Sequence, residues 1–251
     1  MAWRSSGATN EELVANLAGH GMLPSADTTS TAVDERARAA FLAVDRADYA
    51  PRRPYDDAPQ GIGYGVTISA PHMHALAVKH LWPYVVPRAG ERAPRVLDVG
   101  AGSGYLTHVL GEIVGDGGFV LGVEHIPALC RLAETNMRKS AGGRALLDSG
   151  RVVLAVGDGR RGAAALAGVE MDLVASDSRF DAIHVGAAAT EAHQALIDQL
   201  RAPGRLFIPL EDVDSGLQHL WTIDKDVDGT VRRTRLFGVR YVPLTDAPEV
   251  L

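Results

Sequence analysis

The chain has 251 residues, 46% of them hydrophobic and 22% charged, an ordinary globular composition that suffices for one large core. The formal net charge of −6 gives no general attraction to polyanions, so nucleic-acid binding is not expected. The single cysteine, Cys130, excludes an intramolecular disulfide, and no apolar run approaches the roughly 20 residues that span a bilayer. The start MAWRSSGATNEEL lacks the apolar run of a signal peptide, so we expect a cytoplasmic protein without membrane contact. We also expect a monomer.

Two short helices are predicted near the N-terminus. Thr9 followed three residues later by Glu12 has the spacing of a capping box, which opens a helix within residues 9–23. A second helix is predicted over residues 34–44, where three alanine or phenylalanine side chains share one face with a valine. The polar, proline-started residues 24–33 predict a surface loop that resembles an insertion.

The rest of the first 90 residues predicts loops and one more helix. Residues 49–65 contain three prolines and three glycines, which forbid long regular structure. Pro71 fits the first turn of a helix that Pro83 is expected to stop. Residues 1–90 are therefore predicted to be a helical and looped cap that carries the segment TISAPHMHA.

After residue 90, strands and helices alternate. The strands are nearly continuous apolar runs, as a parallel sheet covered on both faces requires, and they are RVLDVG, FVLGVE, RVVLAVGD, FDAIHVG and GRLFIPL. Helices are expected to begin near Gly104, Pro127 and Glu191, while residues 161–178 predict a short helix and an irregular loop, with 167–178 insertion-like.

The predicted fold class is α/β, with a doubly wound, mostly parallel sheet. The segments LQHLWTI and TVRRTRLFGVRYVPL, joined by the turn DKDVDG, add an antiparallel hairpin at the sheet edge. Residues 91–251 would form this sheet domain, and the cap over residues 1–90 would be integrated with it.

The first strand of the sheet runs into the glycine-rich turn Gly100-Ala101-Gly102-Ser103-Gly104. The N–H groups of such a turn face a ligand at the carboxyl edge of the sheet, so a nucleotide-like cofactor is expected. Tyr105 replaces the last glycine of the dinucleotide fingerprint, and Asp98 would repel a pyrophosphate. An ammonium group suits Asp98 better, which favours S-adenosyl-L-methionine (SAM), bound through its amino group directly or through water.

Acidic side chains end the next two strands. Glu124 is placed to accept hydrogen bonds from both ribose hydroxyls of an adenosine, and the alternative is a solvated glutamate at a strand end. Asp158 is placed to receive the adenine amino group, and Gly159 would let the backbone approach the ring. The alternative for Asp158 is an ordinary turn aspartate.

The histidines of TISAPHMHA do not predict a metal site. His72 and His74 lie two residues apart, about 200° around a helix, and no acidic or cysteine partner completes a ligand set. No metal is therefore expected. His184 in DAIHVG is expected to be a buried strand histidine with a partnered ring rather than a catalytic base.

Several motifs together resemble the protein-L-isoaspartate (D-aspartate) O-methyltransferase family, especially its eukaryotic branch. They are MAW, PYDDAPQGIGYGVTISAPHMHA, VLDVGAGSGYLT, DSGRVVLAVGDGR, DAIHVGAAA, ALIDQLRAPGRLFIP and GVRYVPLTD, and they cover nearly the whole chain. The resemblance implies SAM-dependent methyl transfer to the α-carboxyl of L-isoaspartyl residues in damaged peptides and proteins, with D-aspartyl residues as a second candidate. S-adenosyl-L-homocysteine would be the other product, and the methyl ester would collapse to a succinimide that hydrolyses.

The resemblance also implies site residues, with Ser69 as the active-site residue. The implied cofactor-binding positions are Val66, Thr67, Ile68, Ser69, His74, Gly100, Ala101, Gly102, Ser103, Gly104, Glu124, Asp158, Gly159 and Thr245, and Asp98 and His125 are further candidates for cofactor binding. Val185, Gly186 and Ala187 either let an extended substrate peptide lie close to the backbone or serve tight strand–helix packing, and both readings stay open. Glu124 departs from the aspartate of many relatives, and the end TDAPEVL lacks their longer polar tail.

The implied chemistry needs no catalytic base. A substrate carboxylate with a pKa of about 3.3–3.9 is already ionised at neutral pH, so Ser69 would only aim it through one hydrogen bond. Thr67 and Ser69 are expected on a loop that enters the helix begun by Pro71 and closes over cofactor and substrate. A SAM-dependent enzyme for small molecules or RNA, or a non-catalytic SAM-binding module, are the alternatives.

Overall fold

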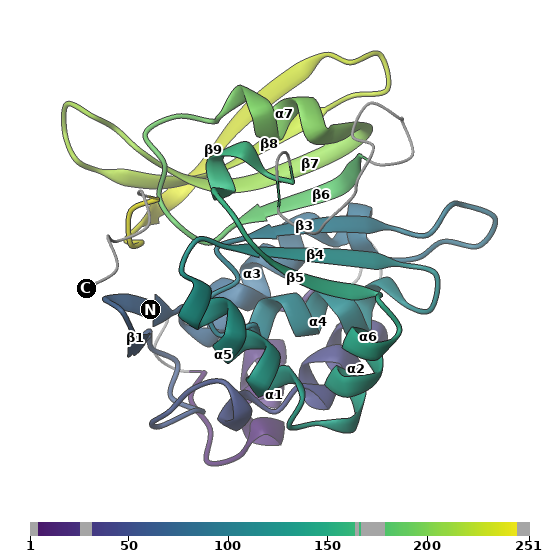
Figure 1. The fold of residues 1–251 in the computed structure, drawn as a ribbon, viewed down its shortest axis with the longest axis vertical. Helices are drawn as coiled ribbons and strands as arrows, with labels where there is room; N and C mark the ends of the chain where they lie inside the picture. The colour runs from purple at the N-terminus through teal and green to yellow at the C-terminus, as the bar shows by residue number, and fades with distance from the viewer. Residues whose placement is uncertain (1–4, 26–31, 164–165, 167–178, 245–251) are drawn as a thin grey trace.

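The computed structural model describes residues 5–25, 32–163, 166 and 179–244, in which a seven-stranded sheet lies between helices (Figure 1). The strand order is β5-β4-β3-β6-β7-β8-β9. The strands are β3 (Arg95–Val99), β4 (Phe119–Glu124), β5 (Val152–Val156), β6 (Phe180–Val185), β7 (Leu200–Glu211), β8 (Gln218–Lys225) and β9 (Val231–Val239). The pairs from β5 to β7 are parallel, and β7, β8 and β9 pair antiparallel. The predicted doubly wound sheet and its edge hairpin are confirmed.

The order of the strands creates a crevice at one edge of the sheet. From β3 the chain moves outward to β4 and β5, and it then crosses to β6 on the other side of β3. Ligands of open α/β sheets bind at such a switch point, outside the carboxyl ends of the strands. The ends of β3 and β6 are joined there by the Gly186 N–H, which donates to the Val99 carbonyl at 2.8 Å.

The central strands are buried on both faces of the sheet. Successive side chains of one strand point to opposite faces and pack into different hydrophobic clusters. Val96 belongs to a cluster that also contains side chains of the cap, whereas Leu97 belongs to a second cluster on the opposite face. The second cluster is covered by helix α7 (Gln194–Gln199), which Figure 1 shows on the side of the sheet away from α1, α2 and α4.

The cap consists of helices and one small hairpin. Its elements are α1 (Asn10–Gly19), α2 (Glu35–Ala43), η2 (Arg46–Asp48), β1 (Gln60–Gly63), β2 (Val66–Ile68) and α3 (Pro71–Val85). Thr9 caps α1 as predicted, while the Glu12 carboxylate accepts the Ala8 N–H at 2.8 Å. The ends of the predicted loop are joined by a bridge between Ser25 and Val33, and residues 26–31 lie outside the described part.

Two predictions for the cap are wrong. Val66–Ile68 is a strand rather than a loop, because the positive-φ residues Gly63 and Gly65 allow the chain to turn and pair β2 with β1. Pro83 does not stop α3, which continues to Val85. So close to the helix end, the proline removes one backbone hydrogen bond, and the Val86 N–H still closes the last turn on Trp82 at 3.2 Å.

The helices of the sheet domain are α4 (Tyr105–Val114), α5 (Pro127–Met137), α6 (Ala141–Asp148) and α7. Helix α6 was not predicted, and α7 begins three residues later than expected, at Gln194 instead of Glu191. Most of the predicted irregular segment 161–178 lies outside the described residues.

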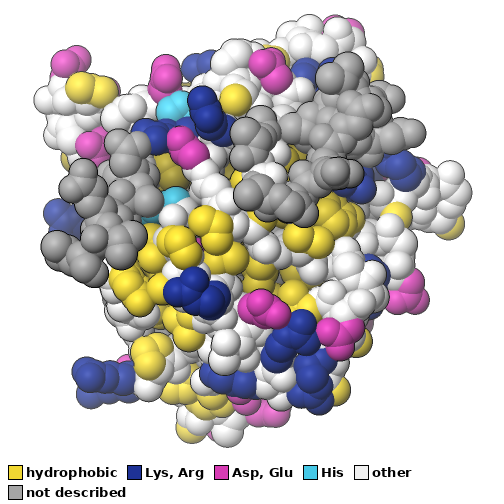
Figure 2. Space-filling model, in the orientation of Figure 1, with side chains coloured by type: hydrophobic (Ala, Val, Ile, Leu, Met, Phe, Trp, Pro, Cys, Tyr) yellow, Lys and Arg dark blue, Asp and Glu magenta, His cyan; other side chains and the backbone are white. Residues whose placement is uncertain are grey.

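No described helix is both long and apolar enough to cross a membrane. On the face seen in Figure 2, lysine and arginine side chains are interspersed with aspartate and glutamate. This mixture differs from the extended basic surface that typically binds nucleic acid.

Candidate active site

Three hollows meet at the edge where β3 and β6 end. The inner cavity, of about 30 Å³, is lined by Thr67, Ile68, Ser69, His74, Asp98, Gly100, Ala101, Gly102, Ser103, Tyr105, Leu106, His184 and Gly186. The outer cavity, of about 400 Å³, and the groove, of about 970 Å³, each share lining residues with it. Thr67 and Gly186 line all three, so the hollows adjoin one another at these two residues.

The glycine turn forms one wall of the inner and outer cavities. Gly100 and Gly102 line both cavities. Their backbone φ angles of +80° and +54° are ones that residues other than glycine rarely adopt. Gly104 lines none of the three hollows, and a Cβ there would lie 2.9 Å from the Ala133 Cβ. Gly104 therefore allows α4 to pack closely against α5.

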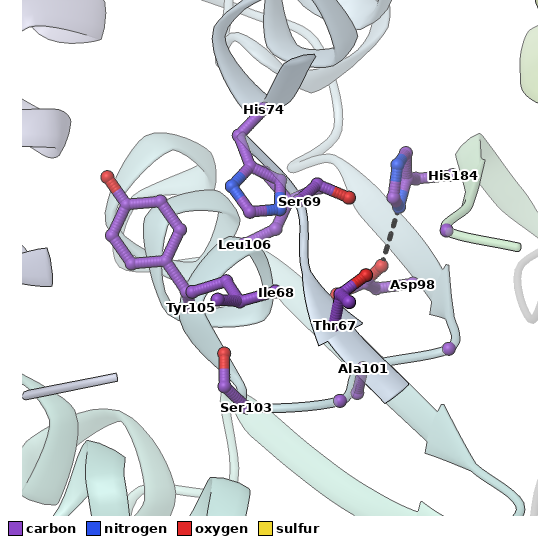
Figure 3. A pocket seen from close by; sticks show the side chains of 13 residues that line it. Thr67, Ile68, Ser69, His74, Asp98, Ala101, Ser103, Tyr105, Leu106 and His184 are labelled. Atoms are coloured by element: carbon purple, nitrogen blue, oxygen red, sulfur yellow. Dashed lines mark hydrogen bonds and ion pairs between the residues drawn. The ribbon is translucent and has the colours of Figure 1, made fainter. Parts of the chain in front are cut away.

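Asp98 is buried between two partners at the floor of the inner cavity. One carboxylate oxygen lies 2.7 Å from His184 Nδ1, drawn as a dashed line in Figure 3, and the other accepts the Thr107 hydroxyl at 2.6 Å. The His184 ring also stacks on Phe207, with 6.1 Å between the ring centroids. His184 is thus the buried, partnered histidine that the sequence predicts.

Glu124 connects the glycine turn to the start of α5 beside the outer cavity. Its side chain is buried, and its two oxygens accept the N–H groups of Gly102 and Ile126, each at 2.9 Å. His125 also lines this cavity, with Nδ1 3.4 Å from Glu124. A carboxylate oxygen can accept a second hydrogen bond, so Glu124 retains acceptor capacity toward the cavity.

Of the neighbouring residues Asp158 and Gly159, only Gly159 borders a hollow. Gly159 lines the outer cavity, but Asp158 is not among the described residues that line any of the hollows. Both oxygens of Asp158 are bound by the Arg160 guanidinium at 2.9 Å, and these hydrogen bonds lower the pKa of the carboxyl group. In this arrangement the carboxylate is engaged by Arg160 rather than directed at the cavity.

Val185 at the end of β6 and the two residues that follow it differ in which hollows they border. Val185 is fully buried in the core, Gly186 reaches all three hollows, and Ala187 lines the outer cavity. The packing alternative therefore fits Val185, whereas Gly186 is the one of the three that borders the groove. Thr245 lies outside the described residues.

The segment from β2 to α3 separates the hollows. Val66 lines the outer cavity, Ile68 the inner cavity, and Ser69 both the inner cavity and the groove. His74 also lines the inner cavity, and in Figure 3 the Ser69 hydroxyl points away from the His74 ring. Burial and the nearby Arg46 hold the pKa of His74 well below its ordinary value, so its ring is neutral at pH 7.

Arg46 is an important residue that sequence analysis missed. It is fully buried, and its Nη2 donates to the Ser69 carbonyl at 2.7 Å while Nη1 lies 3.3 Å from His74 Nδ1. Its guanidinium carbon also lies 5.0 Å from the centre of the Tyr105 ring. Burial lowers the pKa of Arg46 to about 10, which leaves the side chain positively charged at pH 7.

The groove is mostly apolar but contains polar groups near Ser69. It is lined by Met22, Pro59, Thr67, Ser69, Ala70, His72, Met73, Leu76, Gly186, Phe237, Gly238, Val239, Arg240, Tyr241, Val242 and Pro243. The buried Asp57 accepts both the His72 backbone N–H at 3.0 Å and the ring at Nδ1, 2.7 Å away. Tyr241 was also missed as a site residue, although it belongs to the motif GVRYVPLTD that carries part of the resemblance.

Comparisons with known proteins agree on one family. Residues 8–249 match the sequence profile described as protein-L-isoaspartate(D-aspartate) O-methyltransferase (PCMT). A protein-L-isoaspartate O-methyltransferase of Caenorhabditis elegans is 45% identical over 249 residues, 99% of this chain and 98% of that protein. Protein-L-isoaspartate O-methyltransferase 1 of Arabidopsis thaliana is 43% identical over 238 residues, 94% and 91% of the two chains.

A crystal structure from Plasmodium falciparum has a similar fold. It is described as a beta-aspartate methyltransferase (PCMT) in complex with S-adenosyl-L-homocysteine. The two structures give a TM-score of 0.77 at 30% sequence identity, over 96% of this chain and 100% of the other.

Proposed function

The chain belongs to the protein-L-isoaspartate(D-aspartate) O-methyltransferase family, and from this membership we propose how its three hollows divide the reaction. It is a SAM-dependent enzyme that methylates the α-carboxyl of L-isoaspartyl residues in damaged proteins. The methyl ester then closes to a succinimide, which hydrolyses to complete the repair. The observation that carries the proposal is that Thr67 and Gly186 line all three hollows, so the inner cavity adjoins both the outer cavity and the groove.

The outer and inner cavities fit SAM. The positive φ of Gly100 and Gly102 brings the backbone to the cavity wall, where a side chain would occupy space. Glu124 would accept ribose hydroxyls with its remaining lone pairs, and Gly159 would border the adenine. Asp98 would attract the amino group of the methionine part from the inner cavity. When bound, SAM supplies the electrophilic methyl group.

The groove would hold the substrate segment, with its carboxylate beside Ser69. The Ser69 hydroxyl can donate one hydrogen bond that orients the carboxylate without removing its charge. The substrate is already an anion at neutral pH, so the enzyme contributes alignment and exclusion of water rather than a base. Neutral His74 fits this scheme because it adds no positive charge beside the reacting cation.

A paired-peptide assay tests the proposal. Two peptides that differ only in L-isoaspartate or L-aspartate at one position are incubated with enzyme and methyl-labelled SAM. Base-labile label is expected in the isoaspartyl peptide alone, and label in both peptides or in neither would contradict the substrate assignment. A third peptide with D-aspartate at that position determines whether this residue is also accepted.

A further inference from the structure

Arg46 links two residues that line the inner cavity, although it is not itself among the described residues of that lining. The η2 turn that carries Arg46 is fixed by its own cap, since the Asp45 carboxylate accepts the Ala47 N–H at 2.9 Å. From there the guanidinium reaches the segment between β2 and α3. Its Nη2 donates to the Ser69 carbonyl at 2.7 Å, and its Nη1 lies 3.3 Å from His74 Nδ1. One side chain of the cap therefore holds both residues.

The burial of Arg46 costs free energy that its contacts offset only in part. The side chain is fully buried, and its Nε has no hydrogen-bond partner among the described residues. In the same part of the chain, no carboxylate forms an ion pair with it. A buried charge without an opposite charge destabilises a folded protein, and the face of the Tyr105 ring, 5.0 Å from the guanidinium carbon, compensates only partly. A role in stability alone therefore does not account for Arg46.

The contact with His74 fixes which ring nitrogen carries the proton. A guanidinium nitrogen can only donate a hydrogen bond, so His74 Nδ1 must accept it. Burial and the charge of Arg46 hold the pKa of His74 well below its ordinary value, and the ring is neutral at pH 7. A neutral imidazole has one N–H, which must then be at Nε2. Any hydrogen bond that His74 donates into the inner cavity therefore comes from Nε2.

The contact with the Ser69 carbonyl fixes the backbone of the residue proposed to orient the substrate. Ser69 follows the end of β2, and the next residue, Ala70, caps α3 without a side-chain hydrogen bond. Arg46 supplies a fixed point in this turn. Its planar fork can hold two acceptors at once, which the single ammonium group of a lysine does less well.

We propose that Arg46 is a positioning residue whose guanidinium fork holds the Ser69 backbone and the His74 ring together, so that the Ser69 hydroxyl and the His74 Nε2–H are presented to the ligands in one fixed arrangement. This inference rests on the proposed function of the site. It assigns a role to the segment VDRADYA of the cap, to which the sequence analysis gave none.

The tautomer of His74 tests the inference in the unmodified enzyme. In protein with ¹⁵N-labelled histidine, nuclear magnetic resonance is expected to show an unprotonated Nδ1 and a protonated Nε2 for this residue. The spectrum of His74→Gln identifies the His74 signals by their loss. A protonated Nδ1 would overturn the inference, because Arg46 could not then donate to it.

Two variants test the fork by kinetics. Arg46→Lys keeps the charge but not the two parallel donors, and Arg46→Met removes charge and donors while filling the buried space. In both, kcat for an isoaspartyl peptide is expected to fall about 10–100-fold, the range for a displaced positioning group. The rate is counted per site that binds S-adenosyl-L-homocysteine, so a variant that merely loses stability would keep the wild-type value. If Arg46→Met does not fold, Arg46→Lys decides.

A matched control and a second background make the test specific. Arg36 of α2 also donates to a backbone carbonyl, that of Ile113 at 3.3 Å, and it lies outside the described hollow linings. Arg36→Lys should keep wild-type kcat. In the Ser69→Ala background, Arg46→Lys is expected to cost less than about threefold, because the hydroxyl that it positions is gone.

Wild-type kcat in Arg46→Lys, or an equal loss in both backgrounds, would overturn the role of Arg46 while leaving the proposed function intact. Full activity of Ser69→Ala would instead refute the role proposed for Ser69, and the inference with it. A wild-type enzyme that does not methylate the isoaspartyl peptide would refute the proposed function itself.

Discussion

The Glu124 carboxylate combines two tasks in one buried side chain. It fixes the glycine turn and the start of α5 through two backbone N–H groups, and it borders the outer cavity. Replacing Glu124 with alanine should weaken the binding free energy of SAM by about 1–3 kcal/mol, because charge-assisted hydrogen bonds to the cofactor are lost. The dissociation constant of SAM would then rise roughly 5–150-fold. Isothermal titration with SAM measures this change.

Glu134→Ala is the matched control for Glu124→Ala. Glu134 is an exposed glutamate on α5 that pairs with Arg138, so its removal should leave SAM affinity unchanged. Glu124→Gln keeps one acceptor oxygen and should fall between wild type and Glu124→Ala. Equal SAM affinity in wild type and Glu124→Ala would be incompatible with ribose binding by this residue.

At the residue scale, local motifs predict which side chains reach the site but not how they are partnered. Gly100, Gly102 and Glu124 follow from strand ends, since the carboxyl ends of parallel strands share one edge. Arg46 reaches Ser69 across 23 positions of sequence, and no periodicity around DRADYA announces this contact. The Arg160 contact that engages Asp158 is local, but a sequence cannot tell whether such a pair faces a cavity.

At the element scale, Pro83 makes α3 less stable than its length would allow. Pro83 is exposed in the last turn and lacks the N–H that would close on Lys79. Pro83→Ala should stabilise the protein by about 2 kcal/mol, which is the cost of about 3 kcal/mol for a helical proline less the entropy of about 0.4–1 kcal/mol that proline removes from the unfolded chain. Urea unfolding of the two proteins measures the difference.

The control for Pro83→Ala is Pro87→Ala, which lies just beyond the end of α3 and restores no helical hydrogen bond. It should be neutral or slightly destabilising. If Pro83→Ala is less stable than wild type, Pro83 stabilises the protein. It would do so through its packing or by lowering the entropy of the unfolded chain.

The elements that sequence analysis found are those with a strong local pattern. The apolar runs of β3, β4 and β6 are unambiguous because both faces are buried. Helix α6 was missed since AGGRALLD contains two glycines, which disfavour helices, and its formation depends on packing of Leu146 into the core. Strand β2 depends on its pairing with β1, which only the folded chain provides.

At the scale of the whole molecule, one apolar cluster unites the cap with the sheet. Leu13 and Phe41 of the cap share this cluster with Leu110 of α4 and Phe207 of β7. Removing the cap would expose this surface to water, at roughly 25 cal/mol per Å² of apolar area. The cap and the sheet should therefore unfold together, as one integrated domain.

Two tryptophans on opposite sides of the sheet allow this cooperativity to be measured. Trp82 of α3 packs against the cluster shared with the cap, and Trp221 of β8 packs against the other cluster. In a Trp3→Phe background, Trp82→Phe and Trp221→Phe leave one reporter each. The two fluorescence transitions in urea should share one midpoint after correction for the stability change of each substitution.

Ligand binding extends the same test to the site. S-adenosyl-L-homocysteine at 100 times its dissociation constant should stabilise the folded state by about 2.7 kcal/mol, or roughly 5–11 °C in melting temperature for a chain of this size. Because the cavities lie between the cap hairpin and the ends of β3 and β6, both reporters should shift equally. A shift of the Trp82 transition alone would mean that the cap closes on its own, and the two parts would then be separate folding units joined by the ligand.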